Sequence, residues 1–440
     1  MKTPVLFLLI PLIFLGIAYL RAQSIYSRDP TSFFFDSTRA YDRSYSVTRK
    51  NEADAFIESA ATKPFRRTIP YLPTAPRPLL CIGIPTTTRP TGDIYVRTTI
   101  GSLLAGLEPS ERDDIHLMLF VAHSDPNLHP IYTEPWLRNV ADQILTYDMQ
   151  GSQLQHVRDL EKDKLNREKQ IWDYTLMLEA CMKVNAQYIA TFEDDILALD
   201  GWFHRTKAAL QGIREEVDRK NMDGCKWCHE IQGLGMLILL VFYLRLFYTE
   251  QSLGWNVEFW PYYILNSILI ASVVVTAISL YLRRKYKYSW RGMLQRSRHV
   301  FVLALIYTAV AIGFFFMCGR VSMFPIPNGI AQMPKFACCA QGLVYNPARV
   351  PRLIEWYQQK KLGYVDDRAE ELANTGEVGS RWAITPSVVQ HVGTFSTKGE
   401  DDLKKGEVSV SQQRWNFAFE LNNATLLRLE HEAVLLPTTN

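Results

Sequence analysis

Short apolar runs alternate with longer amphipathic segments over the first half of the chain. Four apolar runs have the length of buried strands, at residues 79–86, 115–123, 143–148 and 186–196. Two segments place apolar side chains at helical spacing, residues 95–107 and 155–182. This order of strands and helices predicts an α/β domain with a mostly parallel sheet.

A similar pattern returns toward the C-terminus. Residues 336–345 and 381–392 are expected strands, and residues 351–361 and 369–372 are expected helices. In open α/β sheets, ligands bind beyond the carboxyl ends of the strands. A binding site is therefore expected where the apolar runs end.

Three longer stretches carry no charge, at residues 4–20, 259–282 and 300–318, and each could cross a bilayer as a helix. The loop between the last two, residues 283–298, holds seven basic residues and no acidic one, which is typical of a cytoplasmic loop. We expect an uncleaved signal anchor and a transmembrane hairpin. A cleaved signal peptide is the alternative for the first stretch.

A shorter apolar stretch, residues 231–244, has the length of a buried element rather than of a span. We interpret it as an interfacial or core helix, and a further crossing is the alternative. If it crossed, the chain before it and the chain after the hairpin would lie on opposite sides of the membrane. The two parts could then share no site.

The predicted topology divides the chain into eight parts. They are a cytoplasmic tail (1–3), an anchor (4–20), a lumenal stem (21–77) with a short helix at 51–61, the first part of a lumenal domain (78–258), a span (259–282), the basic loop (283–298), a second span (299–318) and the second part of the domain (319–440). A glycosylation sequon at Asn423 falls in the last part, where it faces the lumen. This sequon supports the topology weakly, because chains of this length often contain one.

Composition limits the possible classes of protein. Of the 440 residues, 48% are hydrophobic and 21% are charged, which is too apolar for a disordered tail. The net charge is only +3, and seven of the 48 basic residues lie in the predicted cytoplasmic loop. The rest of the chain is therefore mildly acidic, and no nucleic-acid partner is expected.

Seven cysteines are present, and some should pair in an oxidising lumen. The first candidates flank the hairpin, and they are Cys225, Cys228, Cys338 and Cys339. Spacing alone gives no connectivity.

Three acids stand at the end of the strand at 186–196, namely Glu193, Asp194 and Asp195. Crowded like charges repel one another, so a divalent cation such as Mg²⁺ or Mn²⁺ would relieve them, and a solvated acidic turn is the alternative. The first strand ends in hydroxyls and a cation, with Thr86, Thr87 and Arg89 suited to a phosphate or ribose, or forming an ordinary loop. His391 ends the last strand beside a glycine, where a ligand role and a core role are equally open.

These residues resemble a family. The segments CIGIPTTTR, FEDD, LRLFYTE, ACCAQGLVY and PSVVQHVGTFS, together with the hairpin, are similar to inverting glycosyltransferases of the nucleotide-sugar-binding GT-A fold. Within them the chain looks most like the Golgi transferases that add N-acetylgalactosamine to glycosylphosphatidylinositol (GPI) anchors, the family of post-GPI-attachment-to-proteins factor four. More distantly it resembles the N-acetylglucosaminyltransferase IV enzymes of N-glycan branching.

The resemblance implies roles for single residues. Asp195 would bind the metal, with His391 as a further metal or diphosphate ligand. Glu193 and Asp194 would hold the metal shell and the donor ribose. The nucleotide would meet Thr86, Thr87, Arg89 and Lys169. The catalytic base would be Asp366 or its neighbour Asp367.

The implied reaction moves a sugar, N-acetylgalactosamine first, from a UDP-sugar to a mannose of the GPI glycan with inversion, at the Golgi membrane or in the ER. It needs a carboxylate base and a Mn²⁺ or Mg²⁺ ion to balance charge on the diphosphate. The partners would be the UDP-sugar, a GPI-anchored protein or GPI glycolipid, and membrane lipid. The alternatives are an N-glycan-branching N-acetylglucosaminyltransferase, a lumenal metal-dependent phosphoester hydrolase and a membrane scaffold or channel.

Overall fold

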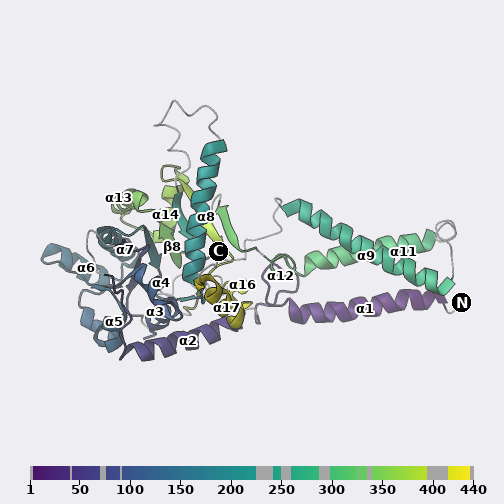
Figure 1. Ribbon diagram of the computed structural model, residues 1–440, viewed down its shortest axis with the longest axis horizontal. Coiled ribbons are helices and arrows are strands. Elements are labelled where there is room, and N and C mark those ends of the chain that lie inside the picture. The colour runs from purple at the N-terminus through teal and green to yellow at the C-terminus, as the bar shows by residue number, and fades with distance from the viewer. Residues whose placement is uncertain are drawn as a thin grey trace. The chain divides into compact units, whose positions relative to one another are not determined.

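The computed structural model describes residues 3–39, 42–69, 76–89, 92–223, 241–248, 259–286, 298–325, 327–333, 339–393 and 415–436. The chain forms two compact units. One comprises Met1–Asp42 and Thr249–Ile326, and the other comprises Arg43–Tyr248 and Pro327–Asn440. Figure 1 draws both, and each is described by itself below.

The first unit is helical, with α1 (Thr3–Ile25), α9 (Trp260–Tyr286), α11 (Arg298–Met317) and the short α12 (Arg320–Met323). Helices α9 and α11 pack against each other (Figure 1). The segment after α1 bonds to the end of α11, because the amide of Phe33 donates to the Met317 carbonyl at 2.9 Å. Buried Asp29 accepts from the amide and the hydroxyl of Ser322, at 2.8 and 2.7 Å.

One helix in the described part of the chain, Trp260–Tyr281, is long and apolar enough to cross a membrane by length and composition. Shorter apolar helices cover Ile13–Ile25 and Ala304–Met317. Because only one of the three described helices is long enough, the signal anchor and the transmembrane hairpin stay predictions.

The second unit is built on a sheet of eight strands in the order β3-β2-β1-β4-β8-β6-β9-β7. The bounds are β1 Leu80–Thr86, β2 Ile115–Val121, β3 Gln143–Leu145, β4 Tyr188–Phe192, β6 Val241–Arg245, β7 Gly329–Met333, β8 Gly342–Tyr345 and β9 Ser380–Thr385. Four of its seven neighbouring pairs are parallel. A small second sheet pairs β5 (Ile196–Ala198) with β10 (Val389–His391). The predicted α/β class is confirmed.

The helices of this unit are α2 Tyr45–Ala60, α3 Val96–Leu104, α4 Pro109–Asp113, α5 Pro135–Val140, α6 Ser152–Lys162, α7 Asn166–Val184, α8 Trp202–Asp223, α13 Val350–Lys360, α14 Val365–Asn374, α16 Phe417–Glu420 and α17 Ala424–Leu435. They cover both faces of the sheet. Alternate residues of β1 show this, because Leu80, Ile82 and Ile84 pack in one core with side chains of α2 and α3. Cys81 packs in the other core, with α7, α13 and α14.

Strands from before and after the predicted hairpin alternate in this sheet. Strand β8 lies between β4 and β6, and β9 lies on the other side of β6. The parts predicted at 78–258 and 319–440 therefore complete one sheet together. Any membrane crossings between Tyr248 and Pro327 must then be even in number.

Several expected elements are corrected. The single helix expected at 155–182 is two helices, α6 and α7, which break at Lys164, where φ is +54°. The strand expected at 186–196 ends at Phe192, and Ile196 begins β5. The strand expected at 381–392 is also two, β9 and β10, because Pro386 lies between them and has no amide hydrogen for a ladder.

The prediction of a helix at 231–244 is wrong for residues 241–244, the part that the structure describes. Residues from Val241 onward form β6, a strand that is almost wholly buried. Residues 231–240 lie outside the described residues. Strand β6 pairs with β8 and β9, and its side chains enter both cores, Leu244 on one face and Tyr243 on the other, which explains why this run is apolar on both faces.

A buried disulfide that the sequence did not predict joins Cys81 of β1 to Cys181 of α7, 100 residues apart. Among the expected pairing residues, Cys339 is disulfide-bonded. Cys225, Cys228 and Cys338 lie outside the described residues. Cys318 is a free thiol.

Candidate active site

The parallel pairing of β1 with β4 brings two candidate segments to one edge of the sheet. Gly83 stands opposite Thr191, so both chains leave the sheet on the same side. The loop that begins at Thr86 therefore meets the acidic strand end, by which we mean Glu193, Asp194 and Asp195. Asp194 and Asp195 are 9% and 8% exposed, which excludes the alternative of a solvated acidic turn.

Asp194 is held by the β1 loop. Its carboxylate accepts from the two terminal guanidinium nitrogens of Arg89, Nη2 at 2.7 Å and Nη1 at 3.2 Å, and from the Thr86 hydroxyl at 2.7 Å. Burial raises the pKa of the Asp194 carboxyl, and Arg89 acts in the opposite direction. Arg89 also reaches Asp195, at 3.2 Å. These contacts fix the β1 loop against the acidic strand end, and the nucleotide contacts expected of Thr86 and Arg89 stay predictions.

His391 joins the acidic strand end from the far end of the chain. Strand β10 pairs with β5 so that His391 stands opposite Ile196, and His391 Nε2 lies 3.3 Å from Asp195 Oδ2. Its Nδ1 is buried without a hydrogen-bond partner among the described residues. A Cβ on Gly393 would come within 2.2 Å of Asp195 Oδ2, so this position requires glycine for close approach.

Thr99 of α3 is a site residue that sequence reasoning missed. Its buried hydroxyl lies within donating distance of the carbonyls of Asp194 and Ile196, at 2.8 and 2.9 Å, which share its one hydrogen, and it accepts from the Ile196 amide at 3.1 Å. One side chain thus holds the turn between β4 and β5 at three points. A threonine on the buried face of a helix gives no such signal in the sequence.

Glu193 is connected to the predicted base through the segment before β8. The side-chain amide of buried Gln341 donates to Glu193 at 2.7 Å. Two residues earlier, the amide of Cys339 donates to Asp366 Oδ2 at 3.0 Å. Burial raises the pKa of Tyr174, and the negative charges of Glu193 and Asp366 raise it further. The second half of the chain therefore brings Asp366 to the edge that holds Glu193.

The aspartate doublet lies in the first turn of α14. Asp366 is half-buried and bonded to Cys339, whereas Asp367 is exposed. Cys339 itself has a φ of +90°, which is uncommon for a residue other than glycine. Its carbonyl accepts from buried Arg245, so both backbone groups of this residue are tied down.

Lys169 is engaged in a buried network beneath the same edge. Its ammonium donates to the Ala122 carbonyl at 2.7 Å, to Tyr147 at 2.9 Å and to Asp173 at 2.9 Å. An ammonium has three donors, so a nucleotide contact would require one of these bonds to be released. Ala122 follows β2, which places Lys169 beside the carboxyl end of that strand.

A small pocket of about 50 Å³ opens next to the acidic strand end. Thr86, Thr87, Arg89, His129 and Asp194 contribute to its lining. Burial lowers the pKa of His129 to about 4, so this imidazole is neutral at physiological pH.

Asn423, the predicted glycosylation acceptor, is exposed. Its side chain caps α17 by accepting a hydrogen bond from the Leu426 amide.

The acidic strand end fits a divalent cation. One ligand atom each from Glu193, Asp195 and His391 lies within 4.8 Å of the other two. Three carboxylates lie at this strand end, and in the described part of the chain the Arg89 guanidinium bonds to two of them, so a divalent ion would balance the remaining negative charge. Carboxylate oxygens suit both Mn²⁺ and Mg²⁺, and the imidazole nitrogen favours Mn²⁺ over Mg²⁺.

Comparisons with known proteins identify a family and a relative. The profile of the family described as GPI-N-acetylgalactosamine transferase PGAP4 matches residues 80–390, which is more than two thirds of the chain. A zebrafish (Danio rerio) relative named alpha-1,3-mannosyl-glycoprotein 4-beta-N-acetylglucosaminyltransferase B is 26% identical over 193 residues. That match covers 41% of this chain and 35% of the relative, so the chain spans about a third of the relative's length.

The family match runs from the first residue of β1 to Gln390, beside His391, and so includes the acidic strand end and the aspartate doublet. The chain therefore belongs to the GPI-N-acetylgalactosamine transferase PGAP4 family.

Proposed function

We propose that this protein is a membrane-bound, metal-dependent glycosyltransferase with a GT-A-like domain, which transfers N-acetylgalactosamine from a UDP-sugar to a mannose of the GPI glycan with inversion. Family membership supports a sugar transfer to GPI. The relative is named for the transfer of another N-acetylated hexosamine to a mannosyl glycoprotein, which supports a nucleotide-sugar donor and a mannose acceptor.

The cluster of Glu193, Asp195 and His391 carries the proposal. It lies beside a pocket lined by threonine hydroxyls and Arg89, at the sheet edge where α/β proteins bind ligands. Asp195 and His391 would hold the ion, with Glu193 in support. A bound Mn²⁺ or Mg²⁺ supplies positive charge for the leaving diphosphate.

The protein's own groups supply the rest of the chemistry. Arg89 and the hydroxyls of Thr86 and Thr87 orient the donor in the pocket. Asp366, fixed by the Cys339 amide, accepts the proton of the acceptor hydroxyl as that oxygen attacks the anomeric carbon. Attack on one face while the nucleotide leaves from the other inverts the configuration at that carbon.

We further propose a lumenal catalytic unit in the Golgi, with α9 and α11 as a transmembrane hairpin and α1 as an anchor. The even number of crossings that the shared sheet requires supports the hairpin. The buried Cys81–Cys181 disulfide supports an oxidising compartment. A GPI glycan hangs from the same bilayer, so tethering at several points would keep the catalytic unit close to its acceptor.

The test uses the full chain purified in detergent with Mn²⁺ and a panel of UDP-sugars. UDP-N-acetylgalactosamine should give UDP release and a GPI glycan heavier by one hexosamine in mass spectrometry. Asp195→Asn should lower turnover by roughly a hundredfold or more at unchanged expression. Preference for another UDP-sugar would overturn the donor, and full activity of Asp195→Asn would overturn the metal site.

Two matched variants, one at each aspartate of the doublet, test which of them is the catalytic base. Asp366→Asn should lower kcat by roughly 10²- to 10⁴-fold while UDP affinity stays the same. Asp367→Asn, with the same chemical change one residue along, should keep most of the activity because its side chain faces solvent. The reverse ranking would move the base to Asp367.

A further inference from the structure

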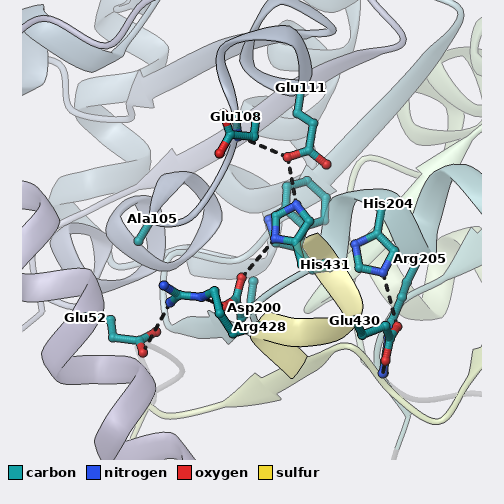
Figure 2. Close-up of polar contacts among 12 residues, drawn as sticks. Glu52, Ala105, Glu108, Glu111, Asp200, His204, Arg205, Arg428, Glu430 and His431 are labelled. Atoms are coloured by element: carbon teal, nitrogen blue, oxygen red, sulfur yellow. Dashed lines mark hydrogen bonds and ion pairs between the residues drawn. The ribbon is translucent and has the colours of Figure 1, made fainter. Parts of the chain in front are cut away.

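A second group of histidines and carboxylates lies outside the candidate active site. Glu111 of α4, His204 of α8 and His431 of α17 each place one ligand atom within 4.8 Å of the others (Figure 2). Glu111 and His431 are 7% and 2% exposed, and the His204 side chain is 10% exposed. Three separate elements thus meet at one buried polar point.

Both nitrogens of His431 face carboxylates. Nδ1 lies 3.2 Å from Asp200 Oδ1, and Nε2 lies 2.9 Å from Glu111 Oε2. A neutral imidazole has one N–H, so it can donate to only one of these oxygens. If Nδ1 donates to Asp200, then Nε2 and Glu111 are two acceptors in contact. Either a second proton or a metal ion must lie between them.

His204 favours the metal ion. Its Nε2 lies 3.1 Å from Glu430 Oε1, and its Nδ1 is buried without a hydrogen-bond partner among the described residues. Figure 2 shows its ring beside that of His431, with ring centroids 5.1 Å apart. A proton on His431 would leave Nδ1 of His204 unsatisfied, and protonating both rings would place two cations side by side. One metal ion would satisfy both histidines.

The surroundings match those of metal-binding histidines. In metal sites, the nitrogen that does not bind the ion usually donates to a carboxylate, which fixes the tautomer and the direction of the ring. Asp200 takes this place for His431, and Glu430 takes it for His204. Each carboxylate is in turn bonded to an arginine, Asp200 to Arg428 at 2.6 Å and Glu430 to Arg205 at 2.7 Å.

We propose that Glu111, His204 and His431 bind one zinc ion, which links the C-terminal helix α17 to α4 and α8. Imidazole nitrogens and a carboxylate oxygen are donors that Zn²⁺ takes in proteins. The proposed role is structural. It is independent of the sugar donor and of the cation at the acidic strand end.

The experiment measures zinc in the full-length protein, purified in detergent and dialysed against metal-free buffer with a weak chelator. Elemental analysis should find one zinc per chain in the wild type and in Asp195→Asn, which removes a ligand of the other site. His204→Ala should lower zinc to the level of the buffer. His156→Ala, which removes an exposed histidine of α6, should retain it.

A second variant separates loss of zinc binding from loss of folding. Glu111→Gln keeps an acceptor for the Glu108 amide but weakens the metal ligand. Adding zinc at about 100 times its Kd should raise the unfolding midpoint of the wild type by roughly 3 to 5 °C and leave Glu111→Gln unchanged. Absence of zinc from the wild type, or equal zinc in His204→Ala, would overturn the proposal and leave a proton between His431 and Glu111.

Discussion

At the scale of residues, the types and positions of the acids were readable from the sequence, but their partners were not. Three acids after an apolar run predict a cation site, and two of them, Asp194 and Asp195, are buried in the structure. Nothing in the sequence indicated that Arg89 would pair with Asp194, or that Thr99 would hold the turn beside it. Such contacts depend on how a loop and a helix pack against a strand end.

A substitution at Gly393 tests whether its backbone must lie close to the Asp195 carboxylate. Gly393→Ala would place a methyl group against the Asp195 carboxylate, at a position now 2.2 Å from Oδ2. We expect lower Mn²⁺ affinity and lower turnover, with little loss of thermal stability. Gly212→Ala on α8 is the control, because its Cβ would have an ordinary 3.5 Å contact and alanine favours a helix. Similar turnover in both variants would contradict the geometry.

The depressed pKa of His129 predicts a pH dependence of stability. Its folded pKa of about 4 lies below the ordinary value of 6.5, so between these values the unfolded chain binds more protons. The free energy of unfolding should therefore fall as pH decreases from about 6.5 to 4, by about 1–2 kcal/mol from this residue after allowance for partial solvent contact.

The measurement compares unfolding midpoints between pH 7 and pH 4.5 for the wild type and two variants. His129→Gln should show a shallower decline than the wild type. His156→Gln, which changes an exposed histidine, should follow the wild type. Equal slopes in all three proteins would mean that His129 takes up a proton in the folded state.

At the scale of elements, buried strands were predicted well because their composition is distinctive. Strands β1, β2 and β4 are near-continuous apolar runs, as expected for central strands covered on both sides. Breaks were missed where one residue decides them, as at Lys164 between α6 and α7. Strand β6 was taken for a helix because a short apolar run has no period that separates the two.

The disulfide between β1 and α7 is the covalent link between two elements of one core. Cys81 and Cys181 enclose most of the first half of the domain, so their bond restricts the unfolded chain strongly. The Cys81→Ala, Cys181→Ala double variant should lose about 2–4 kcal/mol of stability. In a reducing agent the wild type and the double variant should unfold at the same midpoint, because the Cys339 disulfide is then broken in both. Equal midpoints of the two proteins without the reducing agent would contradict a stabilising Cys81–Cys181 bond.

At the scale of the whole molecule, the sequence predicts one domain interrupted by apolar helices, and in the structure strands from before and after these helices alternate in one sheet. Hydropathy alone could not show how the two parts fit together, because strand order depends on contacts between residues far apart in sequence. Family similarity supplied the roles of His391 and Asp366, which no local pattern assigns.

The proposed topology predicts which side of the membrane a protease can reach. In sealed Golgi vesicles with their cytoplasmic face outward, trypsin should cut the basic loop at residues 283–298 and leave both lumenal parts intact. Detergent should expose those parts to cleavage and serves as the control. Cutting of the loop only after the vesicles are opened would reverse the orientation.

The interleaving of strands also has a consequence for synthesis on the ribosome. Strand β6 has only β8 and β9 as neighbours, and both are translated after the apolar helices. Roughly 80 residues separate Tyr248 from Pro327, which at about 5–20 residues per second takes roughly 4–16 s. During that time β4 and β6 present open edges, to which other chains can add. We therefore expect nascent copies of this protein to be most prone to pairing with other chains until β8 and β9 have been translated.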